Sequence, residues 1–258
     1  MKLAMYGWMR MLAVALSMAL PCAAAAAPYS VVLLGDSITR GLTSEPSGPP
    51  YATLLADSLG AGFDVINIGC GGASSRDWSP TAGSAVCGGL PDPLLSETLY
   101  PAMAKPNLPA DLVVIMLGTN DAIGFFEPAP LTSSEYRSAL EELVAGLLFD
   151  GAAKVMLATP PPDFVYVGAM PTLFSYAAEI LALCGASGDA VLCGPDILNL
   201  LQFEDFQTGE IHPNASGHAK IADAMYASIL QAIPEPGTGA MLGLGLLALA
   251  RRRRRPDH

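Results

Sequence analysis

Short, continuously apolar segments alternate with amphipathic segments through the middle of the chain, and this alternation constrains the fold more than any other feature. The apolar segments predict strands at residues 30–34, 63–68, 111–117, 154–158 and 190–193. The segments between and after them predict helices at residues 50–59, 93–104, 133–149, 172–183 and 214–233. Strands that are apolar on both faces are typical of a parallel sheet covered by helices on each side. We therefore predict an α/β fold, a three-layer α/β/α sandwich with a mostly parallel central sheet.

Two of the predicted helices are preceded by residues that cap helix N-termini. Asn214 is the predicted N-cap of the last helix, and Ser133 or Ser134 is the predicted N-cap of the helix at 133–149. Side-chain oxygens of Ser and Asn accept hydrogen bonds from the first free N–H groups of a helix, which favours a helix start at these positions.

Composition and charge exclude several classes of protein. The chain has 258 residues, of which 52% are hydrophobic and 14% are charged, so it is not an intrinsically disordered chain. Seven of the 13 basic residues lie near the two ends, and the region between Pro28 and Pro234 holds six basic and 22 acidic residues, a net charge of −16. Such a charge repels phosphate backbones. We therefore expect no nucleic-acid partner, and we expect a monomer.

The N-terminal segment reads as an export signal. Lys2 precedes an apolar stretch at residues 11–20, which Pro21 interrupts, and a run of alanines follows at residues 23–27. A positive start, an apolar core of this length and a small-residue site are typical of a secretory signal peptide. We predict a signal peptide at residues 1–27 with cleavage near Ala27; a retained anchor helix is the alternative.

The C-terminal segment has three parts. These are Pro234-Glu235-Pro236, an apolar stretch at residues 237–250 and the arginine run Arg251–Arg255. The segment resembles the PEP-CTERM sorting signal of Gram-negative bacteria, which an exosortase recognises. The resemblance implies export through the inner membrane, removal of the tail at residues 234–258, and delivery to the cell surface or extracellular matrix. A plain C-terminal transmembrane anchor is the alternative, and the folded domain is expected at residues 28–233.

Export would place the domain in an oxidising compartment, where cysteines form disulfides. Cys22 would be removed with the signal peptide, which leaves an even number of cysteines. The remaining cysteines are Cys70, Cys87, Cys184 and Cys193. Four cysteines allow three pairings. We favour the two local disulfides, Cys70–Cys87 and Cys184–Cys193, over free thiols. A zinc site is disfavoured because the domain has no Cys-x-x-Cys pair and only two histidines.

Polar or glycine-rich segments follow three of the predicted strands, and another precedes the last helix. They contain Asp36-Ser37, Asn67 to Ser75, Asn120-Asp121 and His212-Pro213. The carboxyl ends of parallel strands share one edge of the sheet, where ligands bind. A hydroxyl nucleophile, an imidazole that takes its proton and donors aimed at an oxyanion are the parts that acyl transfer requires.

From Gly35 to about His218 the chain resembles the SGNH (GDSL-type) hydrolases, which have a flavodoxin-like fold and need no metal or cofactor. The resemblance implies that Ser37 is the nucleophile and that His212 is the general base. It also implies that the oxyanion hole uses the N–H groups of Ser37 and Gly72 and the side chain of Asn120, with Gly69 as the alternative to Gly72. Asp36 and Asp121 are expected to orient loops, and His218 is expected to be structural.

The sequence departs from the family at the acid of the catalytic triad. The family places this acid three residues before the histidine, and here that position is Gly209. Three interpretations remain open, namely that Glu210 replaces the acid, that Asp205 reaches the histidine, or that Ser37 and His212 act as a dyad. We favour Glu210. An inactive protein that keeps the fold as a glycan-binding surface component is the rival of a different class.

Together these features predict an exported serine esterase that hydrolyses short-chain or acetyl esters. The sorting tail favours a polysaccharide as the carrier of the ester, and residues 72–76 are similar to a block of some pectin-type acetylesterases. A lipase or lysophospholipase of the same family is the alternative. The α/β-hydrolase elbow is excluded because Thr39 stands where its second glycine belongs.

Overall fold

The computed structural model of the chain describes residues 27–42, 48–84, 86–87, 90–91, 98–124 and 129–233. The predicted tail and nearly all of the predicted signal peptide lie outside the described residues. Within the described part of the chain, no helix has both the length and the apolar character needed to cross a membrane.

A five-stranded parallel sheet forms the centre of the domain. Its strands are β1 (Tyr29–Gly35), β2 (Phe63–Asn67), β5 (Leu112–Met116), β6 (Val155–Ala158) and β7 (Val191–Cys193). They lie in the order β2-β1-β5-β6-β7, and each neighbouring pair is parallel. A short antiparallel pair, β3 (Val86–Cys87) with β4 (Leu90–Pro91), lies apart from this sheet. The predicted parallel sheet is confirmed.

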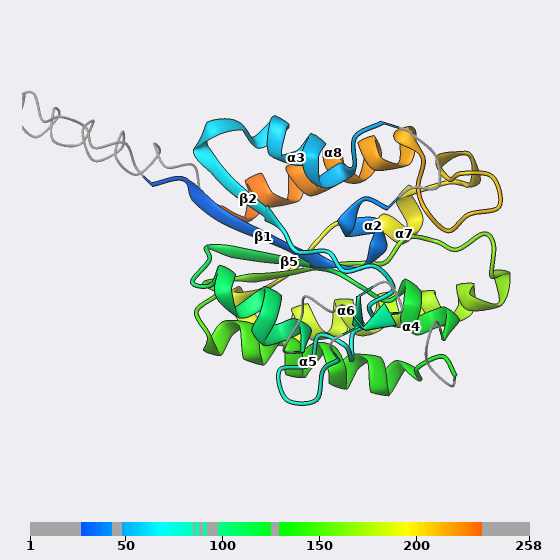
Figure 1. The fold of residues 1–258 in the computed structure, drawn as a ribbon, viewed down its shortest axis with the longest axis horizontal. Coiled ribbons are helices and arrows are strands. Elements are labelled where there is room, and N and C mark those ends of the chain that lie inside the picture. The colour runs from blue at the N-terminus through cyan, green and yellow to red at the C-terminus, as the bar shows by residue number, and fades with distance from the viewer. Residues whose placement is uncertain are drawn as a thin grey trace, which may run out of the picture.

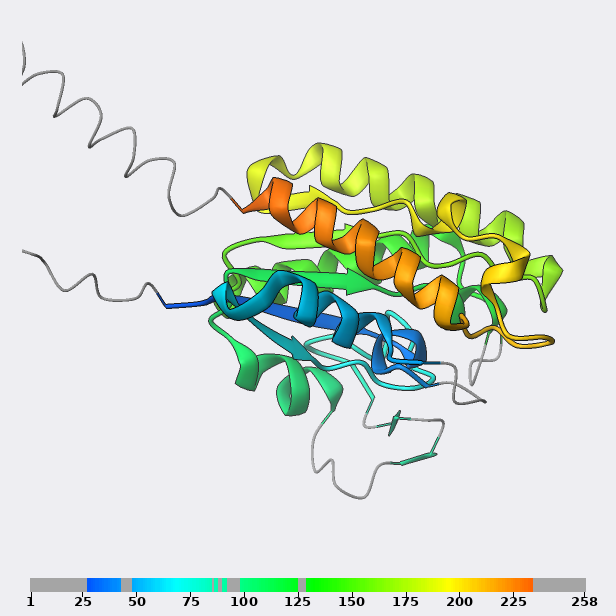
Figure 2. The ribbon, with the colours of Figure 1, turned by 90° about the horizontal axis from the view of Figure 1, so that it is seen from above.

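Helices cover both faces of the sheet, as Figure 1 shows. The helices that pack on the sheet are α3 (Tyr51–Leu59), α5 (Ser133–Phe149), α6 (Met170–Ala186) and α8 (Ala215–Ala232). Helices α3 and α8 lie side by side on one face, and α5 and α6 cover the other (Figures 1 and 2). Short helices occupy the loops at α2 (Ser37–Arg40), α4 (Thr119–Ile123) and α7 (Ile197–Leu200). This is the three-layer α/β/α sandwich that the sequence predicts.

The central strands are buried on both faces, which explains their continuously apolar sequence. In β1, Val31 and Leu33 point into the core beneath α3 and α8, whereas Val32 and Leu34 point into the core above α5 and α6. All four side chains are at most 1% exposed. Because a strand directs alternate side chains to opposite faces, only a strand covered twice can bury all of them.

The cap of α5 and the helix predicted at residues 93–104 differ from the prediction, and α6 extends beyond the predicted residues 172–183 at both ends. Thr132, rather than Ser133 or Ser134, caps α5, because its backbone is still extended and its side chain forms a reciprocal capping box with Glu135. The helix predicted at 93–104 is described only from residue 98, where Tyr100–Ala104 forms a π-helical turn followed by a 3₁₀ turn at Lys105–Asn107. The predicted cap of the last helix is confirmed, since the Asn214 side chain accepts the N–H groups at 216 and 217.

Candidate active site

The polar segments singled out in the sequence meet at one edge of the sheet. Ser37 follows β1, residues 68–75 follow β2, Asn120 follows β5, and His212 lies just before α8. In Figure 1 this edge is the right-hand end of the strands, where α2, α4 and α7 lie. The two described ends of the chain lie at the opposite edge (Figure 2).

Ser37 sits on a tight strand-to-helix turn. It is the first residue of α2, and Asp36 caps that helix by accepting the N–H of Ile38 at 2.9 Å. Gly35 precedes them, and a Cβ at that position would lie 2.8 Å from the Met116 carbonyl oxygen of the neighbouring strand. Glycine therefore allows β1 to end in close contact with β5. The turn leaves the Ser37 side chain at the end of the sheet, 7% exposed.

His212 lies within hydrogen-bond distance of Ser37. Its Nε2 atom is 3.0 Å from Ser37 Oγ, although 175 residues separate them in sequence. Burial lowers the pKa of His212 below its ordinary value of 6.5, and the charge of Glu210 opposes this shift. A neutral imidazole with its proton on Nδ1 can accept the Ser37 hydroxyl proton at Nε2. The pair thus has the arrangement of a nucleophile and its general base.

The backbone around His212 is held by hydrogen bonds to residues 203–207. The Gln207 N–H donates to the His212 carbonyl at 3.2 Å, and the Asn214 N–H donates to the Asp205 carbonyl at 2.8 Å. Phe206 and Pro213 form an isolated antiparallel bridge. These bonds and the start of α8 fix the position from which the imidazole reaches Ser37.

Three residues bear on the identity of the triad acid. Glu210 Oε2 lies 3.7 Å from His212 Nδ1, and the Glu210 side chain is 41% exposed. Asp205 is fully buried but is bonded to Lys220 Nζ at 2.7 Å and to Ser216 Oγ at 3.0 Å. Gly209 has a φ of 74° and no side chain to offer. The structure therefore brings Glu210 to the histidine and holds Asp205 in a different network.

His218 lies between two helices and takes no part in the contact between Ser37 and His212. It is fully buried, and its Nδ1 accepts the N–H of Tyr51 at 3.2 Å, so it joins the first turn of α8 to the first turn of α3. Burial, together with the nearby His212, lowers the pKa of His218 to about 4. It therefore stays neutral at physiological pH and acts as a packing residue between the two helices.

The loop after β2 is bonded to the turn that carries Ser37. Asn67 Nδ2 donates to the Thr39 carbonyl at 2.7 Å, and the Cys70 N–H donates to the Gly35 carbonyl at 3.0 Å. Gly69 packs so closely on α2 that a Cβ would collide with the backbone of residues 39 and 40. Sequence reasoning missed these bonds, because the Asn67 bond spans 28 residues and the Cys70 bond joins two different loops.

The two candidate oxyanion glycines have different surroundings. The Gly69 N–H already donates to Asn67 Oδ1 at 2.9 Å, so it is engaged in the turn itself. Gly72 lies three residues further on, is partly exposed, and has a φ of 75°, a backbone conformation that favours glycine. The geometry therefore favours Gly72 over Gly69 as an oxyanion donor.

Asn120 and Asp121 connect α4 to the same loop. Asn120 is 2% exposed, and its Nδ2 donates one hydrogen to the Ala73 carbonyl at 2.9 Å. A primary amide has two N–H donors, so a second one is left for a ligand. The Asp121 carboxylate accepts the Ser75 N–H at 3.0 Å and the Ser75 hydroxyl at 2.5 Å. Sequence reasoning did not identify Ser75, because its partner is 46 residues away.

Two carboxyl groups are buried beneath the site. Burial raises the pKa of Asp36 to about 7 and that of Asp121 to about 6, even though hydrogen bonds from nearby N–H groups oppose both shifts. The charge of Asp121 adds to the shift at Asp36. Their hydrogen bonds to Ile38 and Ser75 order the nucleophile turn and the oxyanion loop respectively.

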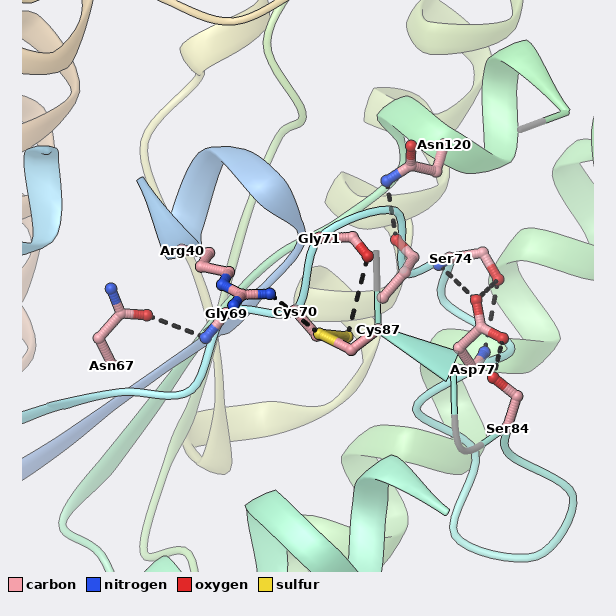
Figure 3. The surroundings of a disulfide bond; sticks show 11 residues. Arg40, Asn67, Gly69, Cys70, Gly71, Ser74, Asp77, Ser84, Cys87 and Asn120 are labelled. Atoms are coloured by element: carbon pink, nitrogen blue, oxygen red, sulfur yellow. Dashed lines mark hydrogen bonds between the residues drawn. A yellow bond between two sulfur atoms is a disulfide. The ribbon is translucent and has the colours of Figure 1, made fainter. Parts of the chain in front are cut away.

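Two disulfides connect neighbouring segments of the domain. Cys70–Cys87 joins the loop after β2 to β3, and Cys184–Cys193 joins α6 to β7, with Cα atoms 5.3 Å apart in both. Arg40 Nη1 lies 3.5 Å from Cys87 Sγ, so the first disulfide also borders α2 (Figure 3). Among the described residues, no group of three His, Cys, Asp or Glu side chains is placed to hold a metal ion.

Comparison with known families gives two matches. Residues 33–220 match the family model described as the GDSL-like lipase/acylhydrolase family. Residues 232–255 match the PEP-CTERM protein-sorting motif. Both resemblances noted in the sequence are thereby confirmed. None of the curated proteins matches this chain.

Several solved structures share the fold. A carbohydrate acetylesterase family member from Sinorhizobium meliloti is 17% identical, with 79% of this chain and 98% of that chain covered and a TM-score of 0.60. A carbohydrate esterase family 2 enzyme from Corynascus thermopiles is 22% identical, with 79% and 66% covered and a TM-score of 0.57. A member of the lipolytic G-D-S-L family from Veillonella parvula is 20% identical, with 76% and 95% covered and a TM-score of 0.53.

Proposed function

This chain belongs to the GDSL-like lipase/acylhydrolase family and is an ester hydrolase, and from that premise we propose that it is an exported serine esterase that removes acetyl or other short acyl groups from a polysaccharide. The observation that carries the proposal is the 3.0 Å approach of His212 Nε2 to Ser37 Oγ. The approach lies at the sheet edge that also holds Asn120.

In the proposed first step, His212 Nε2 takes the Ser37 hydroxyl proton while Oγ attacks the ester carbonyl. The carbonyl oxygen becomes negative in the tetrahedral intermediate. The N–H groups of Ser37 and Gly72 and the free N–H of Asn120 hold this oxygen. When the C–O bond breaks, the imidazolium gives its proton to the leaving alcohol, and the acyl group stays on Ser37.

In the second step, His212 takes a proton from water, and the resulting nucleophile attacks the acyl-enzyme. The same three donors stabilise the second oxyanion. Collapse of this intermediate releases the carboxylic acid, and the proton returns from His212 to Ser37 Oγ. The cycle consumes one ester and one water and restores the free enzyme, with no metal or cofactor.

Glu210 is proposed to orient His212 rather than to act directly on the substrate. At 3.7 Å the contact between Oε2 and Nδ1 is longer than an N–H···O hydrogen bond, and the Glu210 side chain is open to solvent. A solvent-screened carboxylate contributes less than a buried one. His212 must be neutral to act as a base, so the activity is lost on acidification as the imidazole becomes protonated.

Glu210→Gln therefore has a modest and specific expected effect. We expect kcat/KM to fall by less than about tenfold, far less than the ~10⁴-fold loss when a buried triad acid is replaced. The wild-type profile of kcat/KM rises with pH to a plateau, with its midpoint below 6.5 because burial lowers the pKa of His212. Removing the carboxylate removes the charge that raises this pKa, so the midpoint moves to lower pH.

The measurement is kcat/KM for p-nitrophenyl acetate from acidic to neutral pH. Glu204→Gln, another exposed glutamate of the same segment, is the matched control and should leave the profile in place. An unchanged midpoint in Glu210→Gln would show that His212 and Ser37 act as a dyad.

Three observations support an acylated polysaccharide as the substrate. The PEP-CTERM motif points to export by an exosortase in a Gram-negative bacterium, and from there we propose the cell surface or matrix as the destination. Two of the solved structures that share this fold are described as carbohydrate esterases or acetylesterases. The strongly acidic domain disfavours anionic lipid surfaces.

A chain-length series tests this function against its alternatives. We expect kcat/KM to decrease from p-nitrophenyl acetate through butyrate to octanoate, and we expect acetate release from an acetylated polysaccharide. A preference for octanoate would favour a lipase. A protein that hydrolyses none of these esters and yet binds the polysaccharide would be the glycan-binding alternative.

A further inference from the structure

Exposed aromatic side chains gather next to the His212 segment. Phe203 is 67% exposed and Tyr166 is 51% exposed. Phe203 lies in the segment between α7 and His212, and Tyr166 lies in the loop that follows β6. Both segments lie at the edge of the sheet that holds Ser37 and His212.

The Phe203 ring rests on two further rings, and Phe164 of this cluster lies two residues before Tyr166 in the same loop. Phe164 packs edge-on against Phe203 with ring centroids 5.8 Å apart and against Phe206 with centroids 5.3 Å apart. Phe206 is buried and Phe164 is partly buried. Edge-to-face contacts of this kind are favourable and hold each ring in a defined orientation. We refer to Phe164, Tyr166, Phe203 and Phe206 as the aromatic rim.

The backbone beneath the rim is ordered by two buried acids. Asp163 Oδ1 accepts the N–H groups of Val165 at 2.8 Å and Tyr166 at 2.7 Å. Asp205 Oδ2 accepts the Gln202 N–H at 2.9 Å and so caps the turn that carries Phe203. A ring held on an ordered backbone loses little conformational entropy when it binds a ligand.

The rim is continuous with the catalytic machinery. Phe206 forms its bridge with Pro213, which follows His212 in the chain. Gln207, which follows Phe206, donates its N–H to the His212 carbonyl. The loop after β6, which carries Phe164 and Tyr166, also contacts the segment that leads to Asn120. Its Pro160 packs against Gly118, which begins the turn that carries Asn120. A substrate group that extends from Ser37 over this side of the site would meet the exposed rings.

From this arrangement, and resting on the esterase function proposed above, we propose that Tyr166 and Phe203 form a stacking platform for a sugar ring of an uncharged acylated polysaccharide. The flat face of a pyranose carries C–H groups that pack on the electron-rich face of an aromatic ring. The Tyr166 hydroxyl adds a donor and an acceptor of the kind that sugar hydroxyls need. The platform would hold the polymer while its acyl group lies at Ser37.

The openness of the rings favours a sugar over an acyl chain. An alkyl chain gains free energy by leaving water on all sides, so it is best held in an enclosed apolar groove. Phe203 and Tyr166 are open to solvent instead, and so is Val165, the neighbour of Tyr166 in its loop. One flat exposed face matches one flat ring of a long polymer.

The charge of the domain favours an uncharged polysaccharide. The region between the two predicted processing segments carries a net charge of −16. Glu204 is exposed and Glu210 is partly exposed in the segment that carries Phe203 and His212. A polyanionic glycan would be repelled from this surface at low ionic strength. An uncharged polysaccharide meets no such barrier.

The test compares polymer and small-ester hydrolysis in the double variant Tyr166→Ala/Phe203→Ala. We expect the ratio of kcat/KM on acetylated xylan to kcat/KM on p-nitrophenyl acetate to fall by at least ~10-fold, which corresponds to about 1.4 kcal/mol of binding. Phe149→Ala is the matched control, since Phe149 is 90% exposed at the end of α5, at the opposite edge of the sheet, and should leave the ratio unchanged.

Further outcomes distinguish the possible roles of the rim. A fall on p-nitrophenyl octanoate with no change on acetylated xylan would overturn the proposal in favour of an acyl-chain surface. Equal ratios in the double variant and in the wild type would also overturn it. If the double variant loses thermal stability, Tyr166→Phe/Phe203→Tyr, which keeps both rings, should retain the wild-type ratio.

A binding measurement separates this proposal from the proposed function. Retention of the Ser37→Ala protein in gels containing acetylated xylan reports on the platform without any hydrolysis. We expect retention that is lost in Ser37→Ala/Tyr166→Ala/Phe203→Ala and that is weaker with acetylated pectin, a polyanion. Retention without hydrolysis in the wild type would reject the esterase and keep the platform, whereas hydrolysis without rim-dependent retention would do the reverse.

Discussion

Ser37→Ala is expected to abolish ester hydrolysis, with kcat for p-nitrophenyl acetate falling by on the order of 10⁵-fold or more. The variant removes the only atom that forms the acyl bond, and His212 then has no proton to take at 3.0 Å. What remains is the small contribution of substrate binding and of the oxyanion donors. The measurement is steady-state hydrolysis, together with covalent labelling of the protein by a fluorophosphonate.

Mass spectrometry of the labelled protein gives the sharper readout. We expect a single adduct on the peptide that contains Ser37 and none in Ser37→Ala. Ser58→Ala is a suitable control, because Ser58 lies on an exposed part of α3 and its hydroxyl donates to the Leu54 carbonyl of the same helix. Equal activity in Ser37→Ala and the wild type would reject the serine mechanism.

Asn120→Ala is expected to lower kcat by about 10² to 10³-fold, which is on the order of 3 kcal/mol, with a much smaller change in KM. The amide interacts with an oxygen that carries full charge only in the transition state, so its loss affects kcat rather than ground-state binding. Asn120 also donates to the Ala73 carbonyl at 2.9 Å, so the substitution removes a bond that holds the loop. The kcat values are therefore compared at a temperature at which both proteins are folded.

Asn107 offers a control of the same chemistry in a different place. Its amide donates to the Met103 carbonyl at 2.7 Å in a turn that precedes β5, at the edge of the sheet opposite Ser37. Asn107→Ala should leave kcat unchanged. A fully active Asn120→Ala would exclude Asn120 from the oxyanion hole, and a change confined to KM would indicate a role in substrate positioning.

Hydrogen bonds join the segments around the site into one unit. The loop after β2 is bonded to the nucleophile turn through Asn67 and Cys70, and to α4 through Ala73 and Ser75. The proposed oxyanion donor Gly72 lies between these anchors. Preorganised donors of this kind stabilise a developing charge without having to reorient during the reaction.

Much of the fold was predictable from the sequence because its signals are local. An apolar run such as Val31 to Leu34 must be buried on both faces, and the helices between such runs force the strands to be parallel. Parallel strands end at one edge, so the residues after them had to meet. This argument placed Ser37, Asn120 and His212 at one edge of the sheet without any knowledge of their distances.

Other features depended on partners that are distant in sequence. The sequence left Gly69 open as an oxyanion donor, and only the bond from its N–H to Asn67 Oδ1 shows that it is engaged. Asp205 looked able to reach His212, but Lys220 from the next helix binds its carboxylate at 2.7 Å. The cap of α5 fell on Thr132 because the chain is still extended there when it enters the helix.

The sequence by itself determined the parallel sheet, the edge that holds the site and the residue types available there, since burial and strand direction follow from local pattern. The tertiary structure alone decided which atoms face one another. It brought His212 to Ser37 across 175 residues, placed a Glu210 oxygen 3.7 Å from the imidazole, bonded Asp205 to Lys220, and left Tyr166 and Phe203 exposed at the same edge of the sheet. The physical reason is that a hydrogen bond is set by a few tenths of an ångström, and the packing of distant segments controls such distances.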